Sequence, residues 1–247
     1  MMWTAALVLA LTAAPALSET ITWAGYDGPT TRYPHQALGD PVEYTKLVIR
    51  TDEGREFSLE WSKQIVFEDT EPLLVDLDND GSIELLTVES HEEFGSRLAI
   101  YGITTGTLAL TIATPFIGQR YRWMAKVGAA DLDGDGQIEI AYVDRPHLDK
   151  KLRVYRYSRT QTSPTESVAR LTPVADAWGL SNHQIGWPYI VGGIRTCEEG
   201  GTPEIITANG DWTQVMATTL KDDKLISRRL EKYEDPQTIQ SALSCEP

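Results

Sequence analysis

The 247-residue sequence has few of the residues that usually support catalysis or nucleic-acid binding. It contains two cysteines, four histidines and 22 basic residues against 36 acidic ones, for a formal charge of −14. This negative charge argues against binding to nucleic acid. Neither the Gly-x-Ser-x-Gly motif of serine hydrolases nor the His-Glu-x-x-His motif of metallopeptidases occurs. Paired carboxylates of the glycosidase kind remain open among so many acids, but the sequence favours a protein that is not an enzyme.

The four histidines are isolated from one another along the chain, at His35, His91, His147 and His183. An isolated histidine is more often a structural hydrogen-bonding residue than a catalytic base. We also find no amphipathic helical pattern of useful length, which points to an all-β protein.

Long apolar runs are missing except at the start of the chain. Met1 to Ser18 carry no charged side chain and include the apolar run Ala5 to Leu11, which small residues follow. This pattern is typical of a signal peptide cleaved near Ser18, so we expect a periplasmic or secreted protein. A membrane anchor is the competing interpretation, but the run is shorter than the ~20 apolar residues of a spanning helix. No other stretch predicts a membrane span.

The two cysteines are Cys197 and Cys245. In an exported protein such a pair is more often a disulfide than two free thiols. The bridge would fasten the C-terminal tail and close a loop of roughly fifty residues, worth about 3–4 kcal/mol in the chain-entropy model.

Two stretches read Asp-x-Asp-x-Asp-Gly-x-x-Glu, at residues 76–84 and 131–139. Carboxylates at alternate positions of a tight loop can direct their oxygens to one point, which suits calcium with its six to eight oxygen ligands. The glycine at the sixth position permits the sharp turn. The alternative is an acidic, solvated turn, but two matches in the same register favour a metal site.

The loops are not EF-hands, because position 12 is Thr87 in one and Tyr142 in the other, and strand-like residues follow each loop. We therefore expect two calcium ions, held by side chains at positions 1, 3, 5 and 9 and by the backbone carbonyl at position 7. The predicted ligands are Asp76, Asp78, Asp80, Ser82 and Glu84 in the first loop, and Asp131, Asp133, Asp135, Gln137 and Glu139 in the second.

The glutamate that ends each loop recurs with a strand-like pattern after it, at Glu43, Glu84, Glu139 and Glu204. The intervals of about 40–65 residues indicate a repeat array, and four short strands per unit are typical of a propeller blade. We predict one β-propeller domain over residues 19–247, with about four blades of four antiparallel strands. The expected blades span residues 19–70, 71–116, 117–180 and 181–247.

The loops resemble the FG-GAP/VCBS repeats of integrin α-subunit propellers and of many bacterial exported proteins. Both loops have Glu at the ninth position, where the family usually carries Asp. In the fourth unit Thr196 and Gly200 replace the aspartates at positions 1 and 5, so we expect no calcium there. The disulfide at Cys197 would hold that blade instead. The first unit, with Gly39-Asp40-Pro41 in place of a loop, is also expected to be metal-free.

Three segments before the inner strands are rich in aromatic, histidine and arginine residues. Propeller symmetry would carry them to one mouth of the channel, where ligands tend to bind. The predicted ligand-binding residues are Tyr33, His35, Arg122, Trp123, His183 and Trp187. Arginine would favour a carboxylate or phosphate, and the aromatic rings a sugar or peptide. The alternative is packing and cation–π pairing without a ligand.

The favoured function is therefore an exported calcium-binding β-propeller that acts as a binding or adaptor module for an unknown protein or carbohydrate, with structural calcium. One alternative is a calcium-dependent hydrolase or lyase that acts on a carbohydrate or phosphorylated substrate at the channel mouth. A second alternative is a subunit that works only beside a partner chain.

Overall fold

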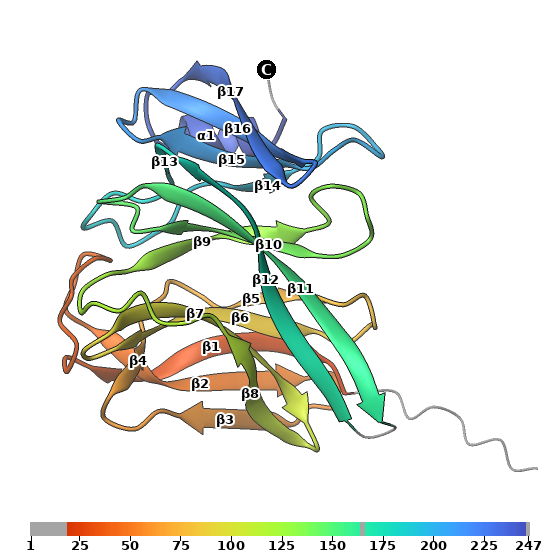
Figure 1. Ribbon diagram of the computed structural model, residues 1–247. Helices are drawn as coiled ribbons and strands as arrows, with labels where there is room; N and C mark the ends of the chain where they lie inside the picture. The colour runs from red at the N-terminus through yellow and green to blue at the C-terminus, as the bar shows by residue number, and fades with distance from the viewer. Residues whose placement is uncertain (1–18, 164–165, 246–247) are drawn as a thin grey trace, which may run out of the picture.

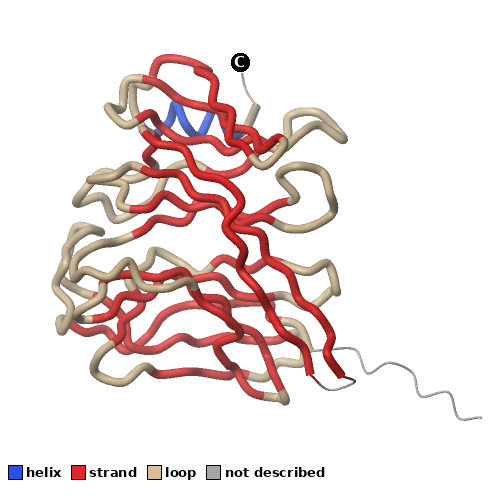
Figure 2. Tube along the Cα trace, in the orientation of Figure 1, coloured by secondary structure: helices blue, strands red, loops and turns tan. Residues whose placement is uncertain are grey.

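The described residues form β-strands and one short helix (Figures 1 and 2). The computed structural model describes residues 19–163 and 166–245, so the predicted signal peptide lies outside the described residues. All the strand pairs are antiparallel, and they form three sheets. The prediction of an all-β protein is confirmed. Within the described ranges, no helix has the length and apolar character needed to cross a bilayer.

The first sheet has eight strands, and it joins what we predicted as two separate blades. Its strands are β1 (Ile21–Thr30), β2 (Glu43–Thr51), β3 (Glu56–Glu60), β4 (Ile65–Phe67), β5 (Leu73–Val75), β6 (Glu84–His91), β7 (Gly95–Thr104) and β8 (Thr107–Ala113). The link is β4, which pairs with β2 through Phe67 and with β6 over its whole length. β4 and β5 lie one after the other along β6, so both halves share this strand.

The second and third sheets each correspond to one predicted blade. The second contains β9 (Met124–Ala130), β10 (Glu139–Asp144), β11 (Lys151–Ser163) and β12 (Glu166–Trp178). The third contains β13 (Leu180–Ser181), β14 (Gly193–Arg195), β15 (Glu204–Asn209), β16 (Gln214–Lys221) and β17 (Lys224–Lys232). β11 and β12 are much longer than the sequence pattern indicated, and their hairpin reaches past its own sheet to β8 (Figure 1).

The four repeated glutamates occupy equivalent places. Glu43, Glu84, Glu139 and Glu204 are the first residues of β2, β6, β10 and β15. Each is paired with the end of the strand before it, at Thr30, Val75, Ala130 and Arg195 respectively. The glutamates therefore mark four structural units, each with its second strand beginning at the same point.

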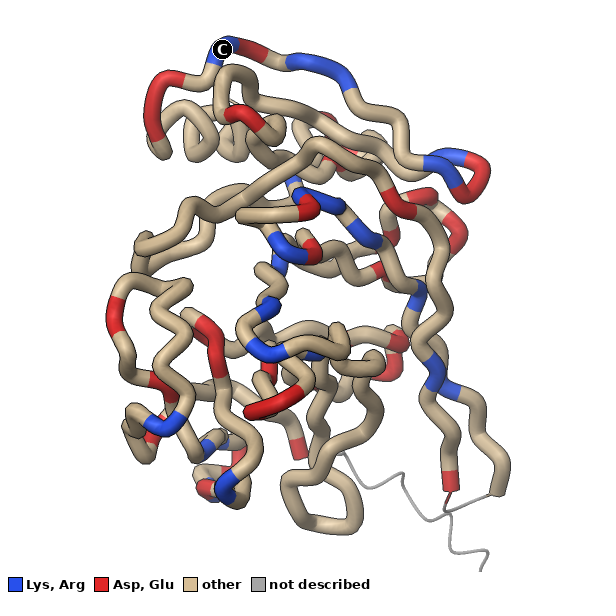
Figure 3. Tube along the Cα trace, turned by 60° about the vertical axis from the view of Figure 1, so that its left-hand side comes forward, with Lys and Arg blue, Asp and Glu red and all other residues tan. Residues whose placement is uncertain are grey.

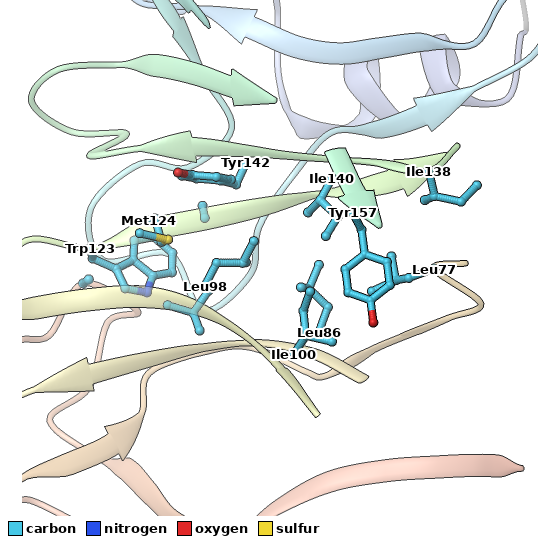
Figure 4. Close-up of a cluster of buried hydrophobic side chains, with 13 residues drawn as sticks. Leu77, Leu86, Leu98, Ile100, Trp123, Met124, Ile138, Ile140, Tyr142 and Tyr157 are labelled. Carbon is cyan, nitrogen blue, oxygen red and sulfur yellow. The ribbon is translucent and has the colours of Figure 1, made fainter. Parts of the chain in front are cut away.

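The sheets stack face to face, and apolar side chains fill the layers between them (Figures 1 and 4). Alternate residues of β10 point to opposite faces. Ile140 and Tyr142 join a cluster with Leu86 and Leu98 of the first sheet. Ala141 and Val143 join another cluster with residues of the third sheet. Because both faces are covered, β10 is buried along its whole length.

The two halves of the first sheet also face each other. Leu47 and Ile49 of β2 share a buried cluster with Leu85 of β6 and Tyr101 of β7. The first two units thus pack as neighbouring layers, although β4 joins them at one edge. Over the described residues the sheets form a stack of three and not a closed ring of four blades.

The outer face of the third sheet is covered by helix α1 (Pro236–Leu243), which the sequence analysis did not predict. Asp235 caps it by accepting hydrogen bonds from the backbone N–H groups of Gln237 and Thr238, and Pro236 suits the first turn. Ile239 and Ala242 pack on the sheet. The predicted disulfide between Cys197 and Cys245 is present, with Cα atoms 5.6 Å apart, and it ties the end of this helix to the loop before β15.

The first-unit glutamate, Glu43, gives a pH-dependent prediction. It is 1% exposed, and its Oε1 has no hydrogen-bond partner. Burial, followed by the charges of Glu68, Asp40 and Asp69, raises the pKa of Glu43 to about 10. A carboxyl group with a raised pKa stabilises the fold most below its unfolded pKa, and that stability is lost as the pH rises toward 10.

Glu43→Gln should therefore be more stable than the unchanged protein at pH 8, by roughly 3–5 kcal/mol, because Glu43 must take up a proton on folding at ~1.4 kcal/mol for each pH unit above its ordinary pKa. The advantage should shrink toward pH 5. Urea unfolding at both pH values measures it, and a difference that does not vary with pH would contradict the prediction.

The disulfide gives a second prediction. Reduction, or Cys197→Ser with Cys245→Ser, should loosen the fourth unit first, because the bridge closes a 48-residue separation that contains most of it. Hydrogen exchange should accelerate in β15–β17 and α1 while β10 stays protected. Equal acceleration in all three sheets would show that the bridge has no local role.

Candidate functional site

The two acidic loops lie at equivalent turns of neighbouring units. Loop 1 (residues 76–83) joins β5 to β6, and loop 2 (residues 131–138) joins β9 to β10. The two loops touch, since the Asn79 side chain donates a hydrogen bond of 3.1 Å to the Gly136 carbonyl. Asn79 has a φ of 57°, in the left-handed region that asparagine tolerates better than most residues.

Loop 1 gathers carboxylate oxygens of Asp76, Asp78 and Glu84 within 4.8 Å of one another. Glu84 is 3% exposed, and its Oε2 accepts a 2.9 Å hydrogen bond from the backbone N–H of Leu77. Burial raises the pKa of Glu84 to about 7, against the lowering effect of that hydrogen bond. Oδ1 of Asp78 is buried and has no hydrogen-bond partner. An unpartnered buried acceptor beside two other carboxylates fits a cation.

Loop 2 repeats this geometry. Asp131, Asp133 and Glu139 bring their oxygens within the same 4.8 Å, and Glu139 Oε2 accepts a 2.9 Å hydrogen bond from Leu132 N–H. Glu139 is fully buried, and burial raises its pKa against the lowering effect of Arg156. Both loops offer only oxygen atoms, the donors that hard cations such as calcium prefer. The residues present therefore fit a divalent cation.

The aspartates at position 5 lie outside these triads. Asp80 Oδ1 accepts the backbone N–H of Ser82 at 2.7 Å, and Asp135 Oδ1 accepts that of Gln137 at 2.8 Å. Such turns are common for aspartate and hold the loop shape. Ligation by Asp80 and Asp135, and by the carbonyls of Ser82 and Gln137, stays a prediction.

Arginine distinguishes the two loops. Arg156 of β11 contacts Glu139 Oε1 and Asp133 Oδ2, both at 2.6 Å. Arg159, on the same strand, lies farther from loop 1, at 3.6 Å from Glu84 and 3.8 Å from Asp78. Loop 2 is therefore partly neutralised by a guanidinium, whereas loop 1 keeps most of its negative charge.

The equivalent position in the fourth unit carries no acidic triad. There Glu204 is held by Arg195 at 2.7 Å and by Arg228 at 2.6 Å. Although burial opposes it, these hydrogen bonds and charges lower the pKa of Glu204. Two arginines thus balance the charge of the glutamate where the aspartates of the other loops are missing.

A pocket of about 260 Å³ lies at the other end of the sheets. Its walls come from the loops before β2 and β9, the loop after β10 and the loop after β13. The lining residues are His35, Tyr121, Arg122, Trp123, Arg145, His147, Leu148 and Ile185. The loops meet closely here, since the Gly186 N–H donates to the Ala37 carbonyl at 2.9 Å.

His35 is held by a buried carboxylate. Its Nδ1 lies 2.5 Å from Oε1 of Glu68, which is fully buried and also accepts a hydrogen bond from Ser90 Oγ. Burial raises the pKa of Glu68, against the lowering effect of the His35 hydrogen bond. Tyr121 stacks on the imidazole with ring centroids 5.1 Å apart. The pair fixes the ring and leaves Nε2 as its other polar atom.

His147 and His183 form a pair, so the prediction that each histidine stands alone was wrong. His147 Nε2 lies 2.7 Å from His183 Nδ1, and His183 Nε2 donates to the Trp187 carbonyl at 2.9 Å. Burial, with the nearby His183, His35 and Lys150, lowers the pKa of His147 to about 4. Burial also lowers the pKa of His183. Both imidazoles are therefore neutral at physiological pH.

The six predicted ligand-binding residues lie in one connected region, but only some face the pocket. Three of them, His35, Arg122 and Trp123, line it. Tyr33 is buried behind them and accepts a hydrogen bond from the Tyr121 N–H at 2.9 Å. His183 is buried behind His147. Trp187 packs on Trp212 with ring centroids 5.2 Å apart. Trp123 is only 2% exposed and donates to the Glu68 carbonyl.

Sequence reasoning missed five pocket residues, which are Tyr121, Arg145, His147, Leu148 and Ile185. A topological signal could have found Arg145, His147 and Leu148. In an antiparallel pair, the residues after the second strand return to the place where the first strand began. The loop after β10 therefore lies beside Trp123, which precedes β9, as the bond from Arg145 N–H to the Trp123 carbonyl shows at 2.9 Å.

The segment that contains both loops is similar to a known family of repeats. Residues 76–142 match the FG-GAP-like repeat. The match begins at Asp76 of loop 1 and ends in β10, just after loop 2. It agrees with the resemblance drawn from the two loops, over that part of the chain. A search of curated proteins finds no match.

The arginine contacts predict unequal loops. Arg156→Leu should raise the affinity of loop 2 for calcium by about two- to fivefold, the factor that corresponds to a partly exposed ion pair of roughly 0.4–1 kcal/mol. The cation would no longer compete with a guanidinium for Asp133 and Glu139. Calorimetric titration of calcium measures the change, with Arg170→Leu on the exposed part of β12 as the matched control. An unchanged or weaker affinity would contradict the prediction.

Proposed function

We propose that the protein is an exported, calcium-binding β-propeller-type module in which calcium is structural and the pocket binds a ligand. The observation that carries the calcium part is the repeated carboxylate triad: two loops, in the same register, each bring three carboxylates within 4.8 Å. The unpartnered Asp78 oxygen supports it. The match to the FG-GAP-like repeat over both loops supports the same reading.

The propeller part is supported by the four equivalent units. Each has its repeated glutamate at the start of its second strand, and the units pack face to face. Blades of a propeller are four-stranded antiparallel sheets that pack in this manner. Export is supported by the disulfide, a bond that persists in oxidising compartments.

A structural role for calcium is supported by distance. Strand β9 begins next to the pocket residue Trp123 and ends at loop 2. Its seven residues span ~23 Å at about 3.3 Å each. An ion in loop 2 is therefore too far from the pocket to polarise a ligand there. It would instead neutralise buried carboxylates and fix the turn between two core strands.

The alternative, a hydrolase or lyase, rests on His35 and Glu68. An imidazole oriented by a buried carboxylate is a common arrangement for a general base. The eight residues that line the pocket include no serine, threonine, cysteine or carboxylate to act as nucleophile or acid. For this reason we favour binding over catalysis.

Calcium should raise the melting temperature of chelator-treated protein by at least about 5 °C at 10 mM. A ligand bound only to the native state at ten to a hundred times its Kd adds ~1.4–2.7 kcal/mol per site, and each kcal/mol shifts a chain of this size by about 2–4 °C. Scanning calorimetry measures the shift.

Matched variants make this test specific. Asp76→Asn and Asp131→Asn should each remove part of the shift and together abolish it, whereas Asp223→Asn, in the exposed turn between β16 and β17, should retain it. Magnesium at the same concentration should act more weakly, because it demands a stricter octahedral geometry. A melting temperature indifferent to calcium would refute the structural role.

A further inference from the structure

The pocket contains one arginine whose charge is uncompensated. Arg145 is already paired, with Asp144 at 2.8 Å and with Asp149 at 2.7 Å. Arg122 donates to the backbone carbonyl of Tyr121 at 3.0 Å and makes no ion pair with any described residue. In Figure 3 several basic positions lie near the centre of the view, with acidic positions around them. Arg122 is therefore the natural contact for one anionic group.

The hydrogen bonds of His147 and His183 assign the tautomer of each ring and leave one nitrogen of the pair as a free acceptor. A backbone carbonyl only accepts, so His183 Nε2 must carry a proton to bond the Trp187 carbonyl. In the neutral ring His183 Nδ1 is then an acceptor, and His147 Nε2 must donate to it. His147, neutral because its pKa is lowered to about 4, keeps a lone pair on Nδ1. No described residue bonds that nitrogen, so a ligand that satisfies it must offer an N–H or O–H.

The aromatic rings of the pocket are already covered, and this argues against a sugar. Tyr121 has His35 stacked on it and the Arg120 guanidinium 4.5 Å from its ring centroid. Trp123 is buried and packs against His147. The exposed apolar surface comes instead from Leu148 and Ile185, which are 58% and 68% exposed. Aliphatic rims of this kind suit an aliphatic side chain, whereas sugars prefer an open aromatic face.

We infer that the pocket binds the C-terminal residue of a peptide with an aliphatic side chain. The terminal carboxylate contacts Arg122, the amide N–H of the last residue donates to His147 Nδ1, and the side chain packs between Leu148 and Ile185. This inference rests on the proposed binding function and names the ligand class for the same pocket. The volume of about 260 Å³ is below the ~300–1,000 Å³ of pockets for drug-sized ligands, so one residue is held and the rest of the peptide lies outside.

Charge and polarity also separate this ligand from a phosphate. A phosphate dianion offers acceptors, but the neutral His147 Nδ1 is itself an acceptor and would face them without a donor. One unpaired arginine balances the single charge of a carboxylate. The formal charge of −14 on the whole chain further disfavours a multiply charged ligand.

The test uses three short peptides and the calcium-loaded full chain. They are N-acetyl-Ala-Leu with a free carboxylate, the same peptide as its C-terminal amide, and the free acid with an N-methylated leucine. Calorimetric titration should show binding of the free acid, with at least tenfold weaker binding of the amide and at least fivefold weaker binding of the N-methyl form. Glucuronic acid and inorganic phosphate, titrated separately, should bind more weakly than the free acid.

Variants place the binding in the pocket. Arg122→Gln should abolish the preference for acid over amide, and Arg170→Gln, which removes the same charge from exposed β12, should retain it. His147→Phe keeps a ring against Trp123 but removes the acceptor, so it should abolish the preference for the N–H peptide. Melting temperatures of all variants establish that they fold.

Several results would overturn the inference. These are equal binding of acid and amide, tighter binding of glucuronic acid or phosphate than of the free acid, an acid preference that survives Arg122→Gln in a folded variant, and no peptide binding at millimolar concentration. If calcium still raises the melting temperature in the same samples, the proposed calcium module stands and only the ligand class is wrong. If neither effect is seen, both proposals fall.

Discussion

The structure depends on a glutamate at the start of the second strand of every unit, which is buried in the first three units and partly buried in the fourth. A carboxylate removed from water is costly unless a counter-charge, hydrogen bonds or a proton compensates it. Glu204 has two arginines, and Glu43 has neither an arginine nor a loop of acids, so burial raises its pKa to about 10 and it stays protonated. Glu84 and Glu139 lie among further carboxylates. In those two units the clustered negative charge of the carboxylates favours binding of a cation.

Strand β11 connects this charge balance to the packing of the sheets. Arg156 and Arg159 are three residues apart, so they point to opposite faces of the strand. One reaches loop 2 of its own sheet, and the other reaches loop 1 of the first sheet. Between them, Tyr157 is buried in the cluster that joins both sheets. Because β11 is long, this one strand contacts both acidic loops and the core between them.

The repeat was predictable because its signal is local. Alternating aspartates, a glycine and a glutamate before a β-branched run are read within nine residues, and all four repeated glutamates begin strands. The joining of the first two units by β4, the reach of β11 and the pairing of His147 with His183 depend on contacts across long stretches of chain. Helix α1 was missed because its apolar face consists mainly of Ile239 and Ala242. For the candidate pocket, the sequence therefore predicted the segments that precede the inner strands of the units but not the loop after β10.

Strands β9 and β10 connect the pocket at one end of the sheet to loop 2 at the other, so the two sites are far apart. The strand pair β9–β10 runs from the pocket to loop 2, with one register shift between Ala141 and Tyr142. A cation in loop 2 would act on the turn between these strands, at ~20 Å from Trp123 and Arg145 and therefore without touching a ligand in the pocket. Tyr121 and Arg145 have φ angles of 58° and 49°, in the left-handed region, at the pocket end. Such backbone strain persists where surrounding structure over-determines it. Local hydrogen bonds supply that constraint here, from Tyr121 N–H to the Tyr33 hydroxyl and from Arg145 N–H to the Trp123 carbonyl.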